Sequence, residues 1–126
     1  MIFQGRFRTV RHSDHAVPSA LPRPLLGPEA LLDIRAWRRA EGAGVPGLPL
    51  LLVTSPRKSG PAVRRNQFRR RARMAFLGQA DPSLLASWIV WIRPLRKGPP
   101  IDRLTYQDIE GQLRLALRRL APTGHP

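Results

Sequence analysis

Residues 42–80 form the most constraining stretch of the sequence, because they contain eight cations and no acid. A helix built from such a stretch cannot form the i,i+4 ion pairs that usually stabilise a charged helix surface, so its cations repel one another in the free protein. We therefore expect this segment to need a partner of opposite charge. The eight cations are Arg57, Lys58, Arg64, Arg65, Arg69, Arg70, Arg71 and Arg73.

The charge of the whole chain points to the same class of partner. The 126 residues are enough for one domain and carry 22 Lys and Arg against 8 Asp and Glu, a formal net charge of +14. Such a charge raises the local concentration of nucleic acid or anionic lipid. The chain has no cysteine, which excludes disulfides, thiolate catalysis and Cys-based zinc sites. No segment approaches the roughly 20 apolar residues of a membrane span, and the start lacks the apolar core of a secretion signal, so we expect an intracellular, cytoplasmic protein.

The pattern of breakers and apolar residues divides the chain into an arm and a domain. Residues 1–27 are rich in proline and lack a sustained period, which predicts an irregular basic arm with a short extended piece over residues 2–10. Residues 28–122 are expected to form a single RNA-binding domain. Within it we predict a helix over 28–42, a strand over 48–55, a helix over 62–77, a strand over 88–92 and a last helix that follows a capping box at Thr105 and Asp108 and ends near Leu120.

This order of elements predicts an α/β two-layer sandwich with a small mixed sheet and about three helices. The strand over 88–92 is apolar on both faces, as a central strand covered by helices on both sides would be. Trp88 and Trp91 point to opposite faces of it. We interpret both as core residues, with base stacking of one of them on single-stranded RNA as the less favoured alternative. Trp37 is also expected in the core.

The predicted helix over 62–77 separates its residues into two arcs. Phe68, Ala72, Ala75 and Phe76 share the arc that would pack on the sheet. Asn66, Arg69, Arg70 and Arg73 share the neighbouring arc, where three guanidinium groups and an amide suit phosphate binding. The alternative is a solvated basic face without a dedicated ligand, which we weigh less because the run lacks acids.

The stretch RKSGPAVRRNQFRRRAR, residues 57–73, resembles the signature of the bacterial ribonuclease P protein component, usually of the form KKxGxAVxRNRxKRxxRE. The resemblance continues through the strand and basic residues WIVWIRPLRKG and a final amphipathic helix, over about residues 48–120. It implies a fold related to the second domain of ribosomal protein S5, with a left-handed crossover. That family has a helix and two strands before the signature, whereas the pattern here predicts a helix and one strand. The second strand is therefore missing, supplied by the arm or hidden in the loop before residue 48.

The resemblance implies a protein subunit of an endonuclease that removes the 5′ leader from precursor tRNA. Its partners would be the catalytic RNA, which performs the Mg2+-dependent hydrolysis, and precursor tRNA, with no membrane. Gly60 matches the glycine of a tight turn. Gln67 stands in place of an Arg, where a neutral amide should bind phosphate more weakly, and Met74 in place of a common acid. The residues expected to bind RNA are Arg57, Lys58, Arg64, Arg65, Asn66, Gln67, Arg69, Arg70 and Arg73.

No arrangement of side chains suggests protein-based catalysis or metal binding. His12, Asp14 and His15 lie close together, but in a proline-rich arm they lack the scaffold that a metal site needs, and we interpret them as solvated. We therefore predict no catalytic residue, no metal ligand and no cofactor bound by side chains. Two alternatives remain: a general RNA-binding or ribosome-associated module without a role in cleavage, and a polybasic membrane-surface protein, for which the apolar arc of the 62–77 helix is narrow.

Overall fold

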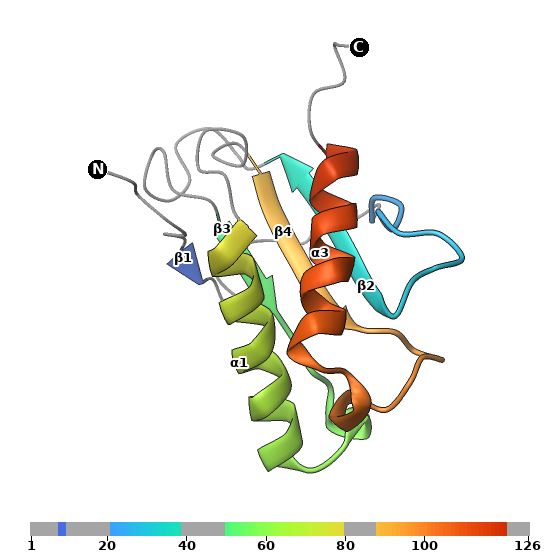
Figure 1. The fold of residues 1–126 in the computed structure, drawn as a ribbon, viewed down its shortest axis with the longest axis vertical. Helices are drawn as coiled ribbons and strands as arrows, with labels where there is room; N and C mark the ends of the chain where they lie inside the picture. The colour runs from blue at the N-terminus through green and yellow to red at the C-terminus, as the bar shows by residue number, and fades with distance from the viewer. Residues whose placement is uncertain (1–7, 10–20, 39–49, 80–87, 121–126) are drawn as a thin grey trace.

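The computed structural model describes residues 8–9, 21–38, 50–79 and 88–120. These residues form one four-stranded sheet with two α-helices on the same face (Figure 1). The sequence-based expectation of His12, Asp14 and His15 as solvated residues lies outside the described part. The elements are β1 (Arg8–Thr9), β2 (Leu32–Arg38), β3 (Leu50–Val53), η1 (Arg57–Ser59), α1 (Ala62–Gln79), β4 (Trp88–Pro94), η2 (Ile101–Arg103) and α3 (Tyr106–Leu120).

The strand order β1-β3-β4-β2 makes a mixed sheet with β4 in its interior. β4 pairs in parallel with β3 and antiparallel with β2, while the short β1 pairs in parallel with β3. The connection from β3 through α1 to β4 joins two adjacent parallel strands. In Figure 1 both strands run downward, β4 lies to the right of β3, and α1 lies in front of the sheet, so this crossover is left-handed. Left-handed crossovers of this kind are rare. This one places α1 over β3 and leaves the side of α1 that faces away from the sheet exposed.

The expected helix over residues 28–42 is wrong, because residues 32–38 form strand β2. Leu32, Ile34 and Ala36 are all buried on the helix-covered side, which is the period of two that a strand requires. β2 finds a full antiparallel partner in β4, from Leu32 opposite Pro94 to Arg38 opposite Trp88. These pairings satisfy the backbone along the whole strand and outweigh the weaker local helix signals. Of the three expected helices, the one over 62–77 and the one that follows the capping box are present among the described residues.

The arm contributes one edge strand. Arg8 and Thr9 pair with Leu50 and Leu51, inside the extended piece expected over residues 2–10, so the arm supplies one strand before the signature, and β2, where a helix was expected, is a further one. Further along, the backbone N–H of Leu25 donates to the carbonyl of Ile34 at 2.8 Å, and the Leu26 side chain is buried in the core. The part of the arm next to β2 is thus held against the domain.

The main core lies between the sheet and the two helices. α1 buries Phe68, Ala72, Ala75 and Phe76, which are the four residues that the sequence places on its apolar arc. α3 buries the expected Ile109, Leu113, Ala116 and Leu117 against the same side of the sheet, with Leu120 partly buried. The predicted helix over 62–77 is confirmed and continues to Gln79.

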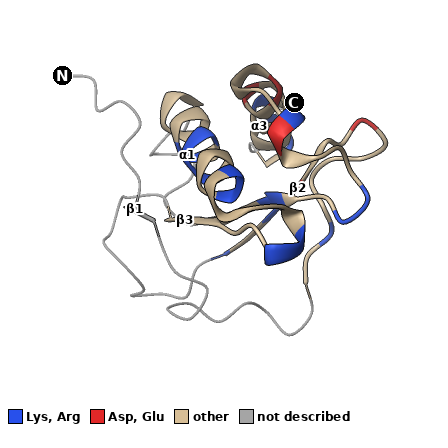
Figure 2. Cartoon of the chain, turned by 90° about the horizontal axis from the view of Figure 1, so that it is seen from below, with Lys and Arg blue, Asp and Glu red and all other residues tan. Residues whose placement is uncertain are grey.

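The opposite face of the sheet carries a smaller buried cluster. Leu50, Leu52, Ile89 and Trp91 form it, with the half-buried Trp37 packed against them. The expectation of helices on both faces is wrong for the described residues, because α1 and α3 both cover the face that carries Trp88 and Val90 (Figure 2). Trp91 is nevertheless a core residue, as predicted, but of the second cluster.

The start of α3 is fixed by the predicted capping box. The Thr105 Oγ1 accepts from the Asp108 backbone N–H at 3.1 Å, and the Asp108 carboxylate accepts from the Thr105 N–H at 3.0 Å. One turn further on, the buried Gln112 joins α3 to the segment that enters β2. Its Oε1 accepts from the N–H groups of Leu31 at 2.6 Å and Leu32 at 3.3 Å, and its Nε2 donates to the Glu29 carbonyl at 3.1 Å.

Candidate nucleic-acid interface

The approach to α1 is a tight turn built around Gly60. Its φ of 141° lies in a region that residues with a Cβ rarely adopt, which explains a glycine at this place in the signature. The Arg65 Nε donates to the Gly60 carbonyl at 3.1 Å, so the first turn of the helix holds the loop that precedes it. Arg57 and Lys58 are exposed on η1, directly before this turn.

The side of α1 nearest β3 carries Asn66, Arg69 and Arg73. Arg69 is half-buried, and its Nη1 donates to the hydroxyl of Ser55, just after β3, at 2.6 Å. Its Nη2 donates to the Asn66 Oδ1 one turn earlier. Arg73 follows one turn later and is half-buried. The two contacts of Arg69 fix the guanidinium plane, so this flank of the helix presents an ordered donor array rather than loose side chains.

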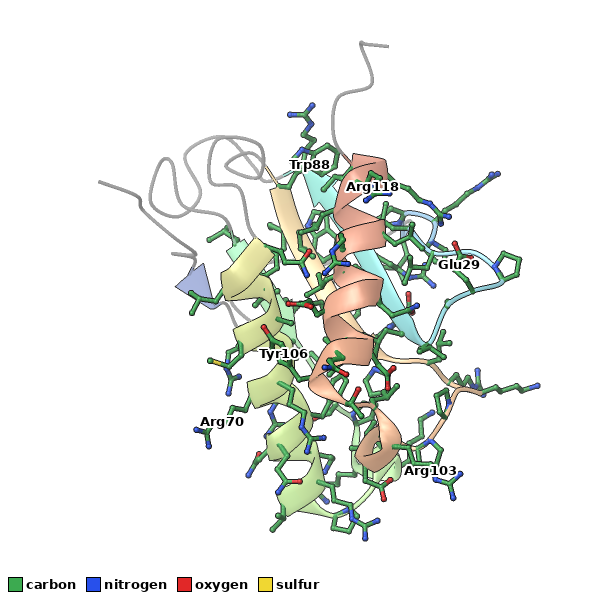
Figure 3. The ribbon with its side chains drawn as sticks, in the orientation of Figure 1. Glu29, Arg70, Trp88, Arg103, Tyr106 and Arg118 are labelled. Carbon is green, nitrogen blue, oxygen red and sulfur yellow. The ribbon has the colours of Figure 1, made fainter. Side chains whose placement is uncertain are left out.

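The other expected RNA-binding residues do not lie on that flank. Arg70 and Gln67 are exposed on the outer side of α1, and Arg70 extends away from α3 (Figure 3). Arg64 turns toward η2, where its Nη1 lies 3.4 Å from the Asp102 carboxylate. The nine predicted residues therefore follow the length of η1 and α1 over two sides of the helix instead of forming one flat patch.

Three further cations, which are not among the nine predicted RNA-binding residues, border this surface. Arg71 donates from its Nη1 to the Leu104 carbonyl at 3.2 Å and so lines the side toward η2 and α3. Arg96 and Lys97 are exposed in the turn after β4 and, together with Lys58, edge a hollow of about 530 Å³ between that turn and η1. The run of basic residues after the 88–92 strand was the signal, but only the fold shows that it meets Lys58.

The acids of the described residues all have partners away from the arc of Asn66, Arg69, Arg70 and Arg73. Asp108 caps α3, and the other four form ion pairs, among which Glu29 lies 2.5 Å from Arg119. The pKa of Glu29 is lowered from its ordinary value, first by a hydrogen bond from its own backbone N–H and then by that from Arg119. Figure 2 shows this separation, with basic residues on α1 and no acidic residue on that helix. The remaining pairs are Asp33 with Arg35 and Arg93, Asp102 with Arg64, and Glu110 with Arg114.

The second face of the sheet combines aromatic rings with a clamped carboxylate. Trp37 and Trp91 meet edge to face with ring centroids 6.0 Å apart, and the Arg93 guanidinium lies 4.3 Å from the centroid of the Trp91 ring. Asp33 is buried between Arg93 and Arg35, at 2.8 Å and 3.0 Å. The Trp91 Nε1 also donates to the Thr54 hydroxyl at 2.9 Å. Trp91 is thus held by its neighbours, which favours packing over the alternative of base stacking.

The succession of a glycine turn, a basic helix in a left-handed crossover and an amphipathic last helix is what the signature implies. The family model described as ribonuclease P matches residues 31–121. The chain belongs to the ribonuclease P protein family. No curated protein matches it. The match spans β2 to α3, so it includes the strand over residues 32–38, where the sequence pattern predicts a helix.

Membership of the ribonuclease P family implies an RNA partner for this protein. Among the described residues, neither helix combines the length and the apolar character needed to cross a bilayer. The ribonuclease P signature itself occupies η1 and α1, with Gln67 exposed on the outer side of the helix.

Proposed function

We propose that this chain is the ribonuclease P subunit that binds the catalytic RNA through α1 and assists removal of the 5′ leader from precursor tRNA. The observation that carries the proposal is the unpaired cationic surface of α1. Of the eight cations in residues 57–73, Arg64 alone has a carboxylate partner within the described residues. A phosphate backbone supplies the charge that the other seven lack and releases counterions on binding.

The contacts of α1 support the proposal that some of its side chains bind RNA as ordered donors and others as flexible ones. Asn66 and Arg69 are held in place by each other and by Ser55, so they can meet an RNA backbone without first becoming ordered. Arg70 is exposed and can reach a phosphate as a flexible donor. No protein side chain is assigned a chemical step. In this proposal the RNA subunit performs the hydrolysis with Mg2+, and the protein stabilises the RNA and its substrate by position and charge.

The test is reconstitution with the cognate catalytic RNA. Cleavage of a precursor tRNA is measured at low Mg2+ with the RNA alone and with the protein added. We expect the protein to raise the rate at low Mg2+ and to lower the Mg2+ concentration needed for half-maximal cleavage. No change in either quantity would refute the proposal.

A second measurement separates this function from general RNA binding. The affinity of the protein for the cognate catalytic RNA is compared with its affinity for an unrelated structured RNA of equal length at the same salt concentration. Because electrostatic binding alone does not depend on sequence or shape, a general RNA-binding module would bind both RNAs alike. We expect a clear preference for the catalytic RNA.

A further inference from the structure

The outer side of α1 exposes a row of apolar residues that the core does not use. Val63, Met74 and Leu77 are 67%, 53% and 39% exposed, on a helix whose remaining outer residues are strongly polar. Together with Gln67 and Arg70 they follow a spacing of three and four residues, which is one continuous stripe of a helix. In this stripe Met74 and Leu77 are neighbours, whereas Gln67 and Arg70 separate them from Val63, and exposed apolar residues that lie together rather than singly mark an interaction site.

A residue of α3 completes this stripe. Tyr106, 39% exposed, is the first residue of α3 and lies on the side of α3 that faces α1 (Figure 3). Its hydroxyl lies 3.8 Å from the point that a Cβ at Gly78 would occupy, so the ring reaches across to the α1 backbone where no side chain stands. Between the two helices remains an open hollow of about 490 Å³, lined by Gln67, Arg70, Arg71, Met74 and Tyr106.

The lining of this hollow matches the chemistry of a nucleotide. Tyr106 offers an aromatic face and Met74 a polarisable thioether, and both bind flat rings well. Arg70 and Arg71 line the hollow, and no acid does; the Arg70 guanidinium extends away from α3 and can bind a phosphate that flanks the hollow, while Arg71 adds positive charge beside η2. A nucleic acid offers phosphates to the arginines and flat bases to Tyr106 and Met74, whereas a protein segment would need acidic and apolar residues in alternation.

Gln67 is the lining residue whose hydrogen bonds can distinguish one base from another. It stands where the signature usually has Arg, and a guanidinium can only donate hydrogen bonds, whereas an amide both donates and accepts. The edge of adenine offers one acceptor and one donor, N7 and the N6 amino group, and an amide pairs with both at once. We propose that the hollow between α1 and α3 binds an unstacked adenine of RNA, with Tyr106 on its face and Gln67 at its edge. The inference rests on the proposed function in that the adenine belongs to an RNA bound along α1.

The experiment uses fluorescently labelled RNA decamers and the full chain. An adenine decamer, a uracil decamer and an abasic decamer carry the same phosphates, so differences among them report the bases alone. We expect the adenine decamer to bind more tightly than the other two. Tyr106→Ala should weaken adenine binding by roughly fivefold or more, the lower end of what one stacked base contributes. Gln67→Ala should reduce the preference for adenine over uracil and should weaken the binding of the adenine decamer more than that of the abasic decamer.

The matched control is Gln107→Ala, which makes the same chemical change on the exposed surface next to Tyr106 and should alter none of the three affinities. Met74→Ala provides a second test of the hollow if Tyr106→Ala lowers the melting temperature. Equal binding of adenine and abasic decamers by the unaltered protein would overturn the proposal. So would adenine binding that neither Tyr106→Ala nor Met74→Ala weakens. If the hollow instead joins two copies of the chain, the protein alone will dimerise and Tyr106→Ala will abolish the dimer, which also overturns it.

The decamer assay contains no catalytic RNA, so its outcome is independent of the proposed function. Tyr106-dependent adenine binding without stimulation of cleavage would refute the ribonuclease P function and leave the site in place. Stimulation of cleavage without Tyr106-dependent binding would refute the site alone.

Discussion

Arg70 offers the sharpest test of where RNA lies on this protein. It is exposed on the outer side of α1 and makes no ion pair within the described residues, so Arg70→Ala removes one charge without breaking a contact described there. Each phosphate contact contributes about 0.7 to 0.9 to the slope of log K against log salt. Between about 50 and about 200 mM salt, loss of that contribution makes the fall in affinity about threefold smaller. Arg70→Ala should therefore bind the catalytic RNA more weakly at low salt and converge on the unaltered protein at high salt.

The assay is a salt titration of binding to the catalytic RNA, with Arg118→Ala as the control. Arg118 is also an exposed arginine of a helix, but it lies in the last turn of α3, far from Arg70 (Figure 3). Both variants lose one positive charge, so an effect of total charge would be equal in the two. We expect the slope to change for Arg70→Ala alone. An unchanged slope for Arg70→Ala, or the same change for both, would refute the assignment of α1 as the contact surface.

Four further predictions concern stability and are checked by thermal or urea unfolding, with an NMR titration for the last. Gln112→Leu leaves one buried and one partly buried backbone N–H group at the start of β2 without their acceptor and should cost about 2–4 kcal/mol; a loss below about 1 kcal/mol would contradict this. Gly60→Ala forces a side chain onto a φ of 141° and should cost about 1 kcal/mol or more. Gly111→Ala, in an exposed helix interior with nothing within 4 Å of the added Cβ, should instead gain about 0.5–1 kcal/mol. Because the pKa of Glu29 is lowered in the folded protein, its contribution is present above the ordinary value of 4.5 and disappears as the pH falls through the lowered pKa; Arg119→Ala should move that midpoint upward.

The sequence predicts those elements whose apolar residues recur with one period only, either that of a helix or that of a strand. In α1 the buried residues recur at positions 68, 72, 75 and 76, which fits a helix and no strand. Residues 31–38 fit both periods, since Leu31, Leu32, Arg35 and Ala36 suit a helix while Leu32, Ile34 and Ala36 suit a strand. β4 decides between them, because it offers hydrogen-bond partners along the whole of β2, and the paired residues lie 50 to 62 positions apart in the sequence.

The candidate site was predictable in composition but not in arrangement. The signature identifies the cations, yet the contact of Arg69 with Ser55 spans 14 residues and depends on how closely α1 packs on β3. The sequence indicates Tyr106 as a site residue only weakly. It is an aromatic residue directly after the Thr105 cap, at a position where a surface helix needs no apolar side chain. Only the fold shows that Tyr106 and Met74 line the same hollow, because α1 and α3 run side by side in parallel.

The placement of the acids explains why a chain of such charge folds and still binds a polyanion. Each described acid pairs with an arginine or caps a helix, and four of the five do so outside α1, so part of the positive charge of β2, β4 and α3 is neutralised. More than half of the net charge of +14 therefore lies in residues 57–73, which hold eight cations and no acid, and Phe68 and Phe76 secure α1 there by apolar burial that does not depend on charge. Repulsion among the exposed arginines then lowers the stability of the free protein without unfolding it, and phosphate contacts relieve that repulsion on binding. RNA should accordingly raise the melting temperature of the protein most at low salt, and a stabilisation that does not change with salt would contradict this account.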